Sequence, residues 1–218
     1  MHIQPRQIAT ILLLVTVVLS TGLARTRPHQ TTDVKQIVQK VKSIYASTSS
    51  AEIRFEQTGG TGNASGTLVY QGGDRYRLDL PKQTIVSDGT KVWTYTPEKK
   101  QVVISRASKG TGRLTPEDIL TAFPGNYATE LAGEEKLNGR PVWIVRCTPG
   151  AGGKIGDVTK ATLYIDKSTY RFQQVDIEGP SVGSLKLRIL SARYGGSIPA
   201  STFTFNPPGG VRVVDLSK

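Results

Sequence analysis

The feature of this sequence that most constrains its fold is a run of strand-like alternation across residues 66–106. In residues 75–80, aromatic or apolar side chains alternate with charged ones. In residues 91–96 the alternation continues, and only Val92 breaks it. Because side chains at i and i+2 lie on the same side of a strand, these segments predict a curved sheet with one apolar face. The residues expected on that face are Tyr76, Leu78, Leu80, Trp93 and Tyr95.

This apolar face has two interpretations: it packs against the protein's own core, or it lines a cavity for a ligand. The wall of a core and the wall of a lipid cavity use the same residue types, because burial stabilises either by about 0.8 kcal/mol per CH₂ group. From the residues alone a packed core is the commoner outcome of such a pattern, and both interpretations stay open.

Similar segments recur along the chain, separated by turn residues such as Gly72-Gly73-Asp74 and Asn138-Gly139. Their regular spacing predicts a mainly β (α+β) single domain with about ten or eleven antiparallel strands, a width at which sheets usually curl. The expected strands are residues 51–57, 66–71, 75–80, 83–87, 91–96, 101–106, 127–131, 141–148, 160–165, 172–178 and 185–194.

Two segments have helical patterns, and two or three helices are expected in all. In residues 32–45, apolar side chains recur at i, i+3, i+4 and i+7, with Thr32 or Asp33 as the N-cap. A shorter helix is predicted at residues 114–123, where Thr115-Pro116 is a good helix start. Its apolar stripe either packs against the sheet or moves as a lid over one opening.

Residues 1–24 have the pattern of a secretory signal peptide. Arg6 precedes an apolar run at residues 8–19, and Gly22-Leu23-Ala24 provides small residues for cleavage. The apolar run is shorter than the roughly 20 residues of a membrane span, although an uncleaved anchor is the alternative. We therefore expect an exported protein whose mature domain comprises residues 25–218.

The scarcity of histidine and cysteine excludes several classes of chemistry. The two histidines, His2 and His29, lie in the signal and at the start of the mature chain. Serine–histidine and cysteine–histidine catalysis and most zinc sites are therefore not expected in the folded domain. Cys147 is the single cysteine and lies in an apolar run, so a buried, inert thiol is expected. We expect no catalytic residues, no metal and no cofactor.

The formal net charge of +11 permits binding to nucleic acid. However, the basic residues are scattered along strands and turns and form no basic stripe on a recognition helix. No nucleic-acid partner is expected. Anionic lipid headgroups or acidic proteins are the more plausible partners of a cationic exported protein.

Several blocks resemble the LolA family of periplasmic carriers, which move lipoproteins between the inner and outer membranes of Gram-negative bacteria. The first blocks are Gly66-Thr67-Leu68 and Arg75-Tyr76-Arg77-Leu78. The most specific block is Thr84-Ile85-Val86-Ser87-Asp88-Gly89 running into Val92-Trp93-Thr94-Tyr95. Near the C-terminus, Phe203-Thr204-Phe205-Asn206-Pro207-Pro208 resembles the closing motif of the family. The order of predicted elements is also similar.

The resemblance implies an open half-barrel whose concave face is covered by helices, with an apolar cavity between them for acyl chains. It implies that Ile119, Leu120 and Phe123 form a lid. The residues expected to line the cavity are Leu68, Tyr70, Tyr76, Leu78, Leu80, Trp93, Tyr95, Trp143 and Val145.

The sequence departs from the family at one position. LolA-like carriers typically have an Arg-Pro pair shortly after the Gly-x-Leu block, and the arginine helps to latch the lid. Gly72 and Gly73 occupy those positions here. Arg75 and Arg77 are expected on the face opposite Tyr76, so neither replaces the latch directly.

Two functions follow from the resemblance. The first is a monomeric, non-enzymatic periplasmic carrier, or chaperone, for lipoprotein acyl chains or lipid, served by an inner-membrane release complex and an outer-membrane receptor. The alternative is a module that senses envelope stress by binding a membrane-anchored regulator in the same concavity.

Overall fold

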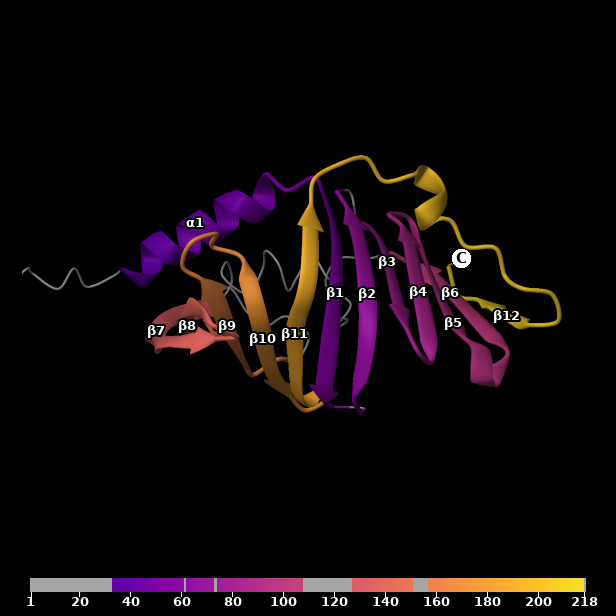
Figure 1. The fold of residues 1–218 in the computed structure, drawn as a ribbon. Helices are drawn as coiled ribbons and strands as arrows, with labels where there is room; N and C mark the ends of the chain where they lie inside the picture. Colours follow the sequence, from indigo (N-terminus) through magenta and orange to yellow (C-terminus); the bar gives the residue numbers. More distant parts are fainter. Residues whose placement is uncertain (1–32, 61, 73, 108–126, 151–156, 218) are drawn as a thin grey trace, which may run out of the picture. The chain divides into compact units, whose positions relative to one another are not determined.

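The computed structural model describes residues 33–60, 62–72, 74–107, 127–150 and 157–217. These residues form one sheet of twelve strands, in the order β12-β6-β5-β4-β3-β2-β1-β11-β10-β9-β8-β7 (Figure 1). All neighbouring strands are antiparallel except β12 and β6, which are parallel. The sheet is open, with β12 and β7 as its two edges.

The strands are β1 Ser50–Gly59, β2 Ala64–Gln71, β3 Arg75–Leu80, β4 Gln83–Asp88, β5 Lys91–Thr96, β6 Gln101–Arg106, β7 Tyr127–Leu137, β8 Arg140–Pro149, β9 Lys160–Asp166, β10 Phe172–Gly179, β11 Gly183–Tyr194 and β12 Arg212–Asp215. All eleven strands expected from the sequence are present. The expectation missed β12, which has only four residues and follows the turn-rich stretch at residues 206–210. Its pairing depends on β6, far away in the sequence.

The helix α1 (Val34–Ala46) confirms the helical pattern near the N-terminus. Asp33 is its N-cap, and the Asp33 carboxylate accepts a hydrogen bond of 2.9 Å from the backbone N–H of Lys35. A helix of this length is marginal alone, so its stability depends on burial of one face. That face consists of Ile37, Val38, Val41 and Tyr45.

The described residues contain one α-helix and two short 3₁₀ helices, η1 (Pro97–Lys99) and η3 (Ala200–Phe203). The expectation of two or three covering helices is therefore not confirmed. The helix predicted at residues 114–123 and the signal segment at residues 1–24 lie outside the described residues. Among the described helices, none is long and apolar enough to cross a membrane.

The register divides the sheet into two faces. We call the side of Ile53, Leu68, Leu78 and Ile85, which are partners across β1 to β4, the inner face. The same face continues through β11 and β10 to β9, where Leu187, Val175 and Leu163 are partners. The opposite side is called the outer face.

The helix α1 covers the inner face of the half of the sheet that contains β7 to β10. Its buried residues form one hydrophobic core with residues of those strands, and side chains such as Val145, Leu163 and Ile177 are completely buried. This half of the inner face is therefore a filled core.

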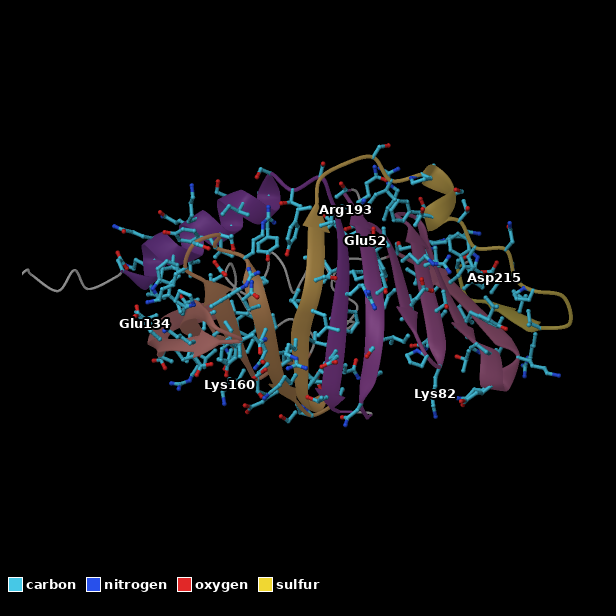
Figure 2. The ribbon with its side chains drawn as sticks, viewed as in Figure 1. Glu52, Lys82, Glu134, Lys160, Arg193 and Asp215 are labelled. Atoms are coloured by element: carbon cyan, nitrogen blue, oxygen red, sulfur yellow. The ribbon has the colours of Figure 1, made fainter. Side chains whose placement is uncertain are left out.

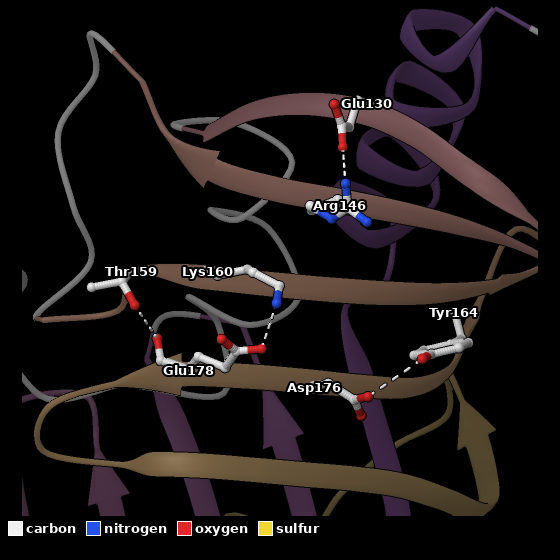
Figure 3. Close-up of polar contacts among 7 residues, drawn as sticks. All are labelled: Glu130, Arg146, Thr159, Lys160, Tyr164, Asp176 and Glu178. Atoms are coloured by element: carbon white, nitrogen blue, oxygen red, sulfur yellow. Dashed lines mark hydrogen bonds and ion pairs between the residues drawn. The ribbon is translucent and has the colours of Figure 1, made fainter.

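The outer face is charged over much of the sheet. Glu52 of β1 and Arg193 of β11 form an ion pair with a nitrogen–oxygen distance of 2.6 Å (Figure 2). Further along, Lys160 pairs with Glu178 at 2.6 Å, and the Tyr164 hydroxyl donates to Asp176 at 3.4 Å (Figure 3). These cross-strand pairs suit the outer face of β1, β11, β10 and β9 to contact with water.

The outer face of β3 to β5 has an apolar cover from the C-terminal segment. Phe203 of η3 is 2% exposed, and η3 contacts β3 and β4. The Phe205 ring lies 5.7 Å from that of Tyr95. Val86 and Val102 are completely buried on this side. The sheet thus has apolar layers on both of its faces, over different strands.

Candidate ligand cavity

A cavity of about 420 Å³ lies on the inner face, beside the core that α1 fills. It follows β10, β11 and β1 to β4, and Tyr45 of α1 borders it. Most of its lining is apolar. The lining residues are Tyr45, Ile53, Phe55, Gln57, Gly60, Leu68, Leu78, Leu80, Gln83, Phe172, Val175, Ser181, Val182, Leu185, Leu187, Ile189 and Tyr194. Its volume is within the range of small-molecule sites, about 300–1,000 Å³.

The cavity is elongated along β1 and β11. At one end it is bordered by Gly60, Ser181 and Val182, where the two strands meet the turn after β10. At the other end it is bordered by Tyr45, Phe172 and Tyr194. Because a strand rises about 3.3 Å per residue, the path along β1 from Ile53 to Gly59, next to Gly60, spans roughly 20 Å. This shape suits an extended chain better than a compact ring.

Gly66 of β2 allows two large side chains to meet in the wall. It is the register partner of Phe55. A Cβ atom at this position would lie 2.6 Å from Cζ of Phe55 and 2.8 Å from Cδ2 of Leu80. Both distances are shorter than van der Waals contact, so the absence of a side chain here lets Phe55 and Leu80 approach each other across β2.

Tyr45 forms the aromatic end of the cavity with Phe172 and Tyr194. Its ring stacks on Phe172 at 4.8 Å and meets the edge of Tyr194 at 6.3 Å. The backbone N–H of Phe172 donates to the Tyr45 hydroxyl at 3.0 Å. Burial, and then the nearby Tyr194, raise the pKa of Tyr45 well above its ordinary value. The Tyr45 phenol, which would be neutral at physiological pH even with its ordinary pKa, therefore stays protonated at higher pH as well.

Leu68, Leu78 and Leu80, expected from the sequence to line a cavity, do line this one. Tyr70 and Tyr76 are register partners of each other on the same inner face, beyond the residues that border the cavity. The expectation that Arg75 and Arg77 face away from Tyr76 is confirmed by the alternation within β3.

Trp93 and Tyr95 are placed differently from the expectation. Their register partners are Val86 and Thr84, whereas the inner-face residues Ser87 and Ile85 pair with Val92 and Thr94. Trp93 and Tyr95 therefore lie on the outer face, where Phe205 packs near Tyr95. The prediction that they share a face with Leu78 is wrong. Alternation within β5 shows which of its residues share a face, but it does not show whether that face is the inner or the outer face of the sheet.

Trp143 and Val145 of β8 are buried on the inner face but do not border the cavity. They belong to the core under α1. The Trp143 ring lies 5.1 Å from that of Tyr170, with the Lys167 ammonium 5.6 Å from it. The expected lid residues Ile119, Leu120 and Phe123 lie outside the described residues.

Two strands that the sequence analysis did not assign to the cavity make up much of its wall. β1 contributes Ile53 and Phe55, and β11 contributes Leu185, Leu187 and Ile189. Both strands have the same period-two alternation as β3, so their apolar faces can be recognised in the sequence. The pairing of β1 with β11, which brings the apolar stripes of the two strands together, cannot be recognised there.

The chemistry that the cavity lining offers is burial of apolar surface. Within the described ranges, no group of three or more histidine, cysteine, aspartate or glutamate side chains is arranged to hold a metal. Cys147 is completely buried, and burial raises the pKa of its thiol to about 12. The arrangement can therefore hold a largely apolar ligand reversibly, with a few polar groups at its ends.

Comparison with known proteins gives a consistent result. The family model described as outer membrane lipoprotein carrier protein LolA matches residues 46–132. The outer-membrane lipoprotein carrier protein of Bordetella bronchiseptica is 31% identical over 163 residues, which cover 70% of each chain. That of Dechloromonas aromatica is 28% identical over 158 residues, covering 69% of this chain and 71% of the relative.

Among solved structures, an uncharacterised conserved protein from Thermus thermophilus superposes with a TM-score of 0.56. The superposition covers 84% of this chain and 98% of the other, at 15% sequence identity. At that identity the two proteins share a fold, and nothing more follows from the match.

Proposed function

Because this chain belongs to the outer membrane lipoprotein carrier protein (LolA) family, we propose that it is an exported carrier that holds acyl chains in its cavity. Its cargo would be lipoproteins or free lipid, moved through the periplasm between membranes. Residues 1–24 would direct export, and residues 25–218 would form the carrier domain.

The observation that carries this proposal is the apolar cavity of about 420 Å³ along β1 and β11. Burial of a ten-carbon stretch of acyl chain in such a cavity contributes roughly 8 kcal/mol, at about 0.8 kcal/mol per CH₂ group. A contribution of this size offsets part or all of the entropic cost of confining the ligand, and the binding is reversible because no covalent bond is formed.

Loading and release require the cavity to open to a membrane or a partner and to close in transit. We propose that Ile119, Leu120 and Phe123 form the moving cover, as in the family. The family arginine that latches this cover is replaced by Gly72. The backbone N–H of Gly72 donates to Ser49 at 2.9 Å, and Nε of Arg75 donates to the Gly72 carbonyl at 3.4 Å. A different contact would therefore have to hold the cover.

The test is extraction of the purified full-length protein with organic solvent, followed by mass spectrometry. We expect lipid in near-stoichiometric amounts, and its loss in Leu78→Glu, which puts a carboxylate into the apolar wall. Val213→Glu is the matched control, because Val213 of β12 is 47% exposed and lies away from the cavity.

Equal lipid in the two variants would overturn the assignment of the cavity. A lipid-free wild-type protein that fails to bind added acyl chains would overturn the carrier function. Capture of the periplasmic segment of a membrane-anchored regulator by such a lipid-free protein would favour the alternative, an interaction module.

A further inference from the structure

Arg171 immediately precedes β10 and lies against the aromatic end of the cavity. Its Cζ is 3.5 Å from the centre of the Tyr194 ring and 5.8 Å from that of Tyr45. Tyr45, Phe172 and Tyr194 all border the cavity. Arg171 itself is not among the residues that line the cavity, but its guanidinium contacts two that are, Tyr45 and Tyr194.

One end of this guanidinium has no partner within the described part of the chain. The Nη1 atom of Arg171 is buried and makes no hydrogen bond there. The stacking on Tyr194 uses the flat face of the guanidinium, whereas its N–H donors point out from the edge of that plane. The aromatic contact accordingly leaves the hydrogen-bonding capacity of Nη1 unused.

Those neighbours of Arg171 that the structure describes also do not neutralise its charge. Tyr45 is a neutral phenol at physiological pH. Among the ion pairs of the described residues, none includes Arg171. On the outer face, by contrast, Arg146 pairs with Glu130, as Figure 3 shows. Arg188 likewise pairs with Glu56 and Arg193 with Glu52.

A buried guanidinium nitrogen without a hydrogen-bond acceptor is costly, and it is expected where a ligand supplies the missing acceptor. We propose that Arg171 binds the anionic headgroup, a carboxylate or a phosphate, of a ligand whose acyl chain occupies the cavity. This inference rests on the proposed function, because it assigns the headgroup end of the same site.

The geometry suits such a ligand. A guanidinium donates two parallel hydrogen bonds to a carboxylate or phosphate, and both bonds are strengthened by charge. From the Tyr45 end, an acyl chain can follow β1 and β11 toward Gly60 and Ser181. The headgroup and the chain would thus bind to adjacent, chemically distinct parts of one elongated site.

The test compares anionic and neutral ligands that share the same chain. Binding of oleate and methyl oleate to delipidated wild-type protein is measured by titration calorimetry. Dioleoylphosphatidic acid and dioleoylglycerol, which differ in the phosphate, are the second pair. We expect the anionic member to bind at least about tenfold more tightly in one pair. Preference within the first pair identifies a carboxylate, and preference within the second identifies a phosphate.

Arg171→Gln should abolish this preference while methyl oleate binds as before. Arg171→Lys keeps the charge but not the paired donors, so it should retain only part of the preference. Arg146→Gln, which removes an arginine from the outer face, should leave both affinities unchanged. Circular dichroism checks that each variant folds. If Arg171→Gln does not fold, the preference of the wild-type protein for anionic ligands and its partial loss in Arg171→Lys still test the headgroup assignment.

The two proposals fail in different ways. If wild-type protein binds none of the four ligands, the carrier function is wrong. If it binds anionic and neutral ligands equally, or if Arg171→Gln weakens both members of a pair equally, Arg171 is a structural residue and only the headgroup assignment is wrong.

Discussion

Ile189 and Leu190 are consecutive residues of β11, yet only Ile189 borders the cavity. Leu190 is 47% exposed. The register explains the difference. β1 pairs Phe55 with Ile189 and Arg54 with Ser191, so Leu190 is the extra residue of a β-bulge and has no partner in β1. Two adjacent apolar side chains thus have opposite environments, which makes them a matched pair for testing the site.

Ile189→Glu should weaken binding of a fluorescent fatty acid by at least about tenfold, because a carboxylate is placed in an apolar wall. Leu190→Glu changes the same side-chain chemistry at an exposed position and should alter affinity by no more than about twofold. Fluorescence titration of both variants decides. Equal effects would show that the fatty acid binds elsewhere.

Gly66→Ala should reduce the free energy of unfolding by about 1–3 kcal/mol, because its Cβ would overlap Phe55 and Leu80. Urea denaturation measures the change. Gly72→Ala is the control, since a Cβ there would meet only the Ser49 carbonyl oxygen, at 3.9 Å. It should change stability by less than about 0.5 kcal/mol. A neutral Gly66→Ala variant would contradict the close approach in the cavity wall.

Phe203→Ala should reduce the free energy of unfolding by about 3–5 kcal/mol, because Phe203 is 2% exposed and covers the outer face of β3 and β4. Denaturant unfolding of this variant is compared with that of Val213→Ala, which alters a half-exposed side chain. We expect the second change to be below about 1 kcal/mol. A small effect of Phe203→Ala would show that the C-terminal segment adds little to the fold.

Cys147 should make stability fall as pH rises above about 9. Burial raises the pKa of its thiol in the folded state from 9.0 to about 12, so the unfolded chain loses this proton first. The protonated Cys147 thiol makes its full contribution to the free energy of unfolding below pH 9. This contribution is lost between pH 9 and about 12, with a slope of up to about 1.4 kcal/mol per pH unit.

The check is the difference in unfolding free energy between wild type and Cys147→Ala, measured from pH 8 to 10. A constant difference would contradict the prediction. In addition, the native thiol should resist labelling at pH 8 and react fully in urea, since Cys147 is completely buried.

Strand positions were largely predictable, because they depend on local alternation and turn residues. The bounds of β3, β5 and β6 agree with the expected ones residue for residue. The helix α1 was equally predictable from its apolar spacing and from Asp33 as N-cap. These features are written into neighbouring residues, so a single sequence is enough to find them.

The face of each strand was harder to predict. Val92 interrupts the aromatic alternation of β5 and is the exception to its pattern. In the sheet, Val92 pairs with Ser87 and lies on the inner face, while Trp93 pairs with Val86 on the outer face. The outer face here is also buried beneath Phe203 and Phe205, so burial alone could not tell the two sides apart.

The sequence alone determined the number and order of nearly all strands, the first helix, and the apolar character of Leu68, Leu78 and Leu80. Only the tertiary structure decided which apolar stripes enclose a cavity and which fill a core. The reason is that a stripe carries no information about what lies opposite it: α1 packs onto Val145 and Leu163, whereas the stripes of β1, β3 and β11 line an open space. That outcome depends on contacts between residues far apart in the chain, and alternation within one strand cannot encode them.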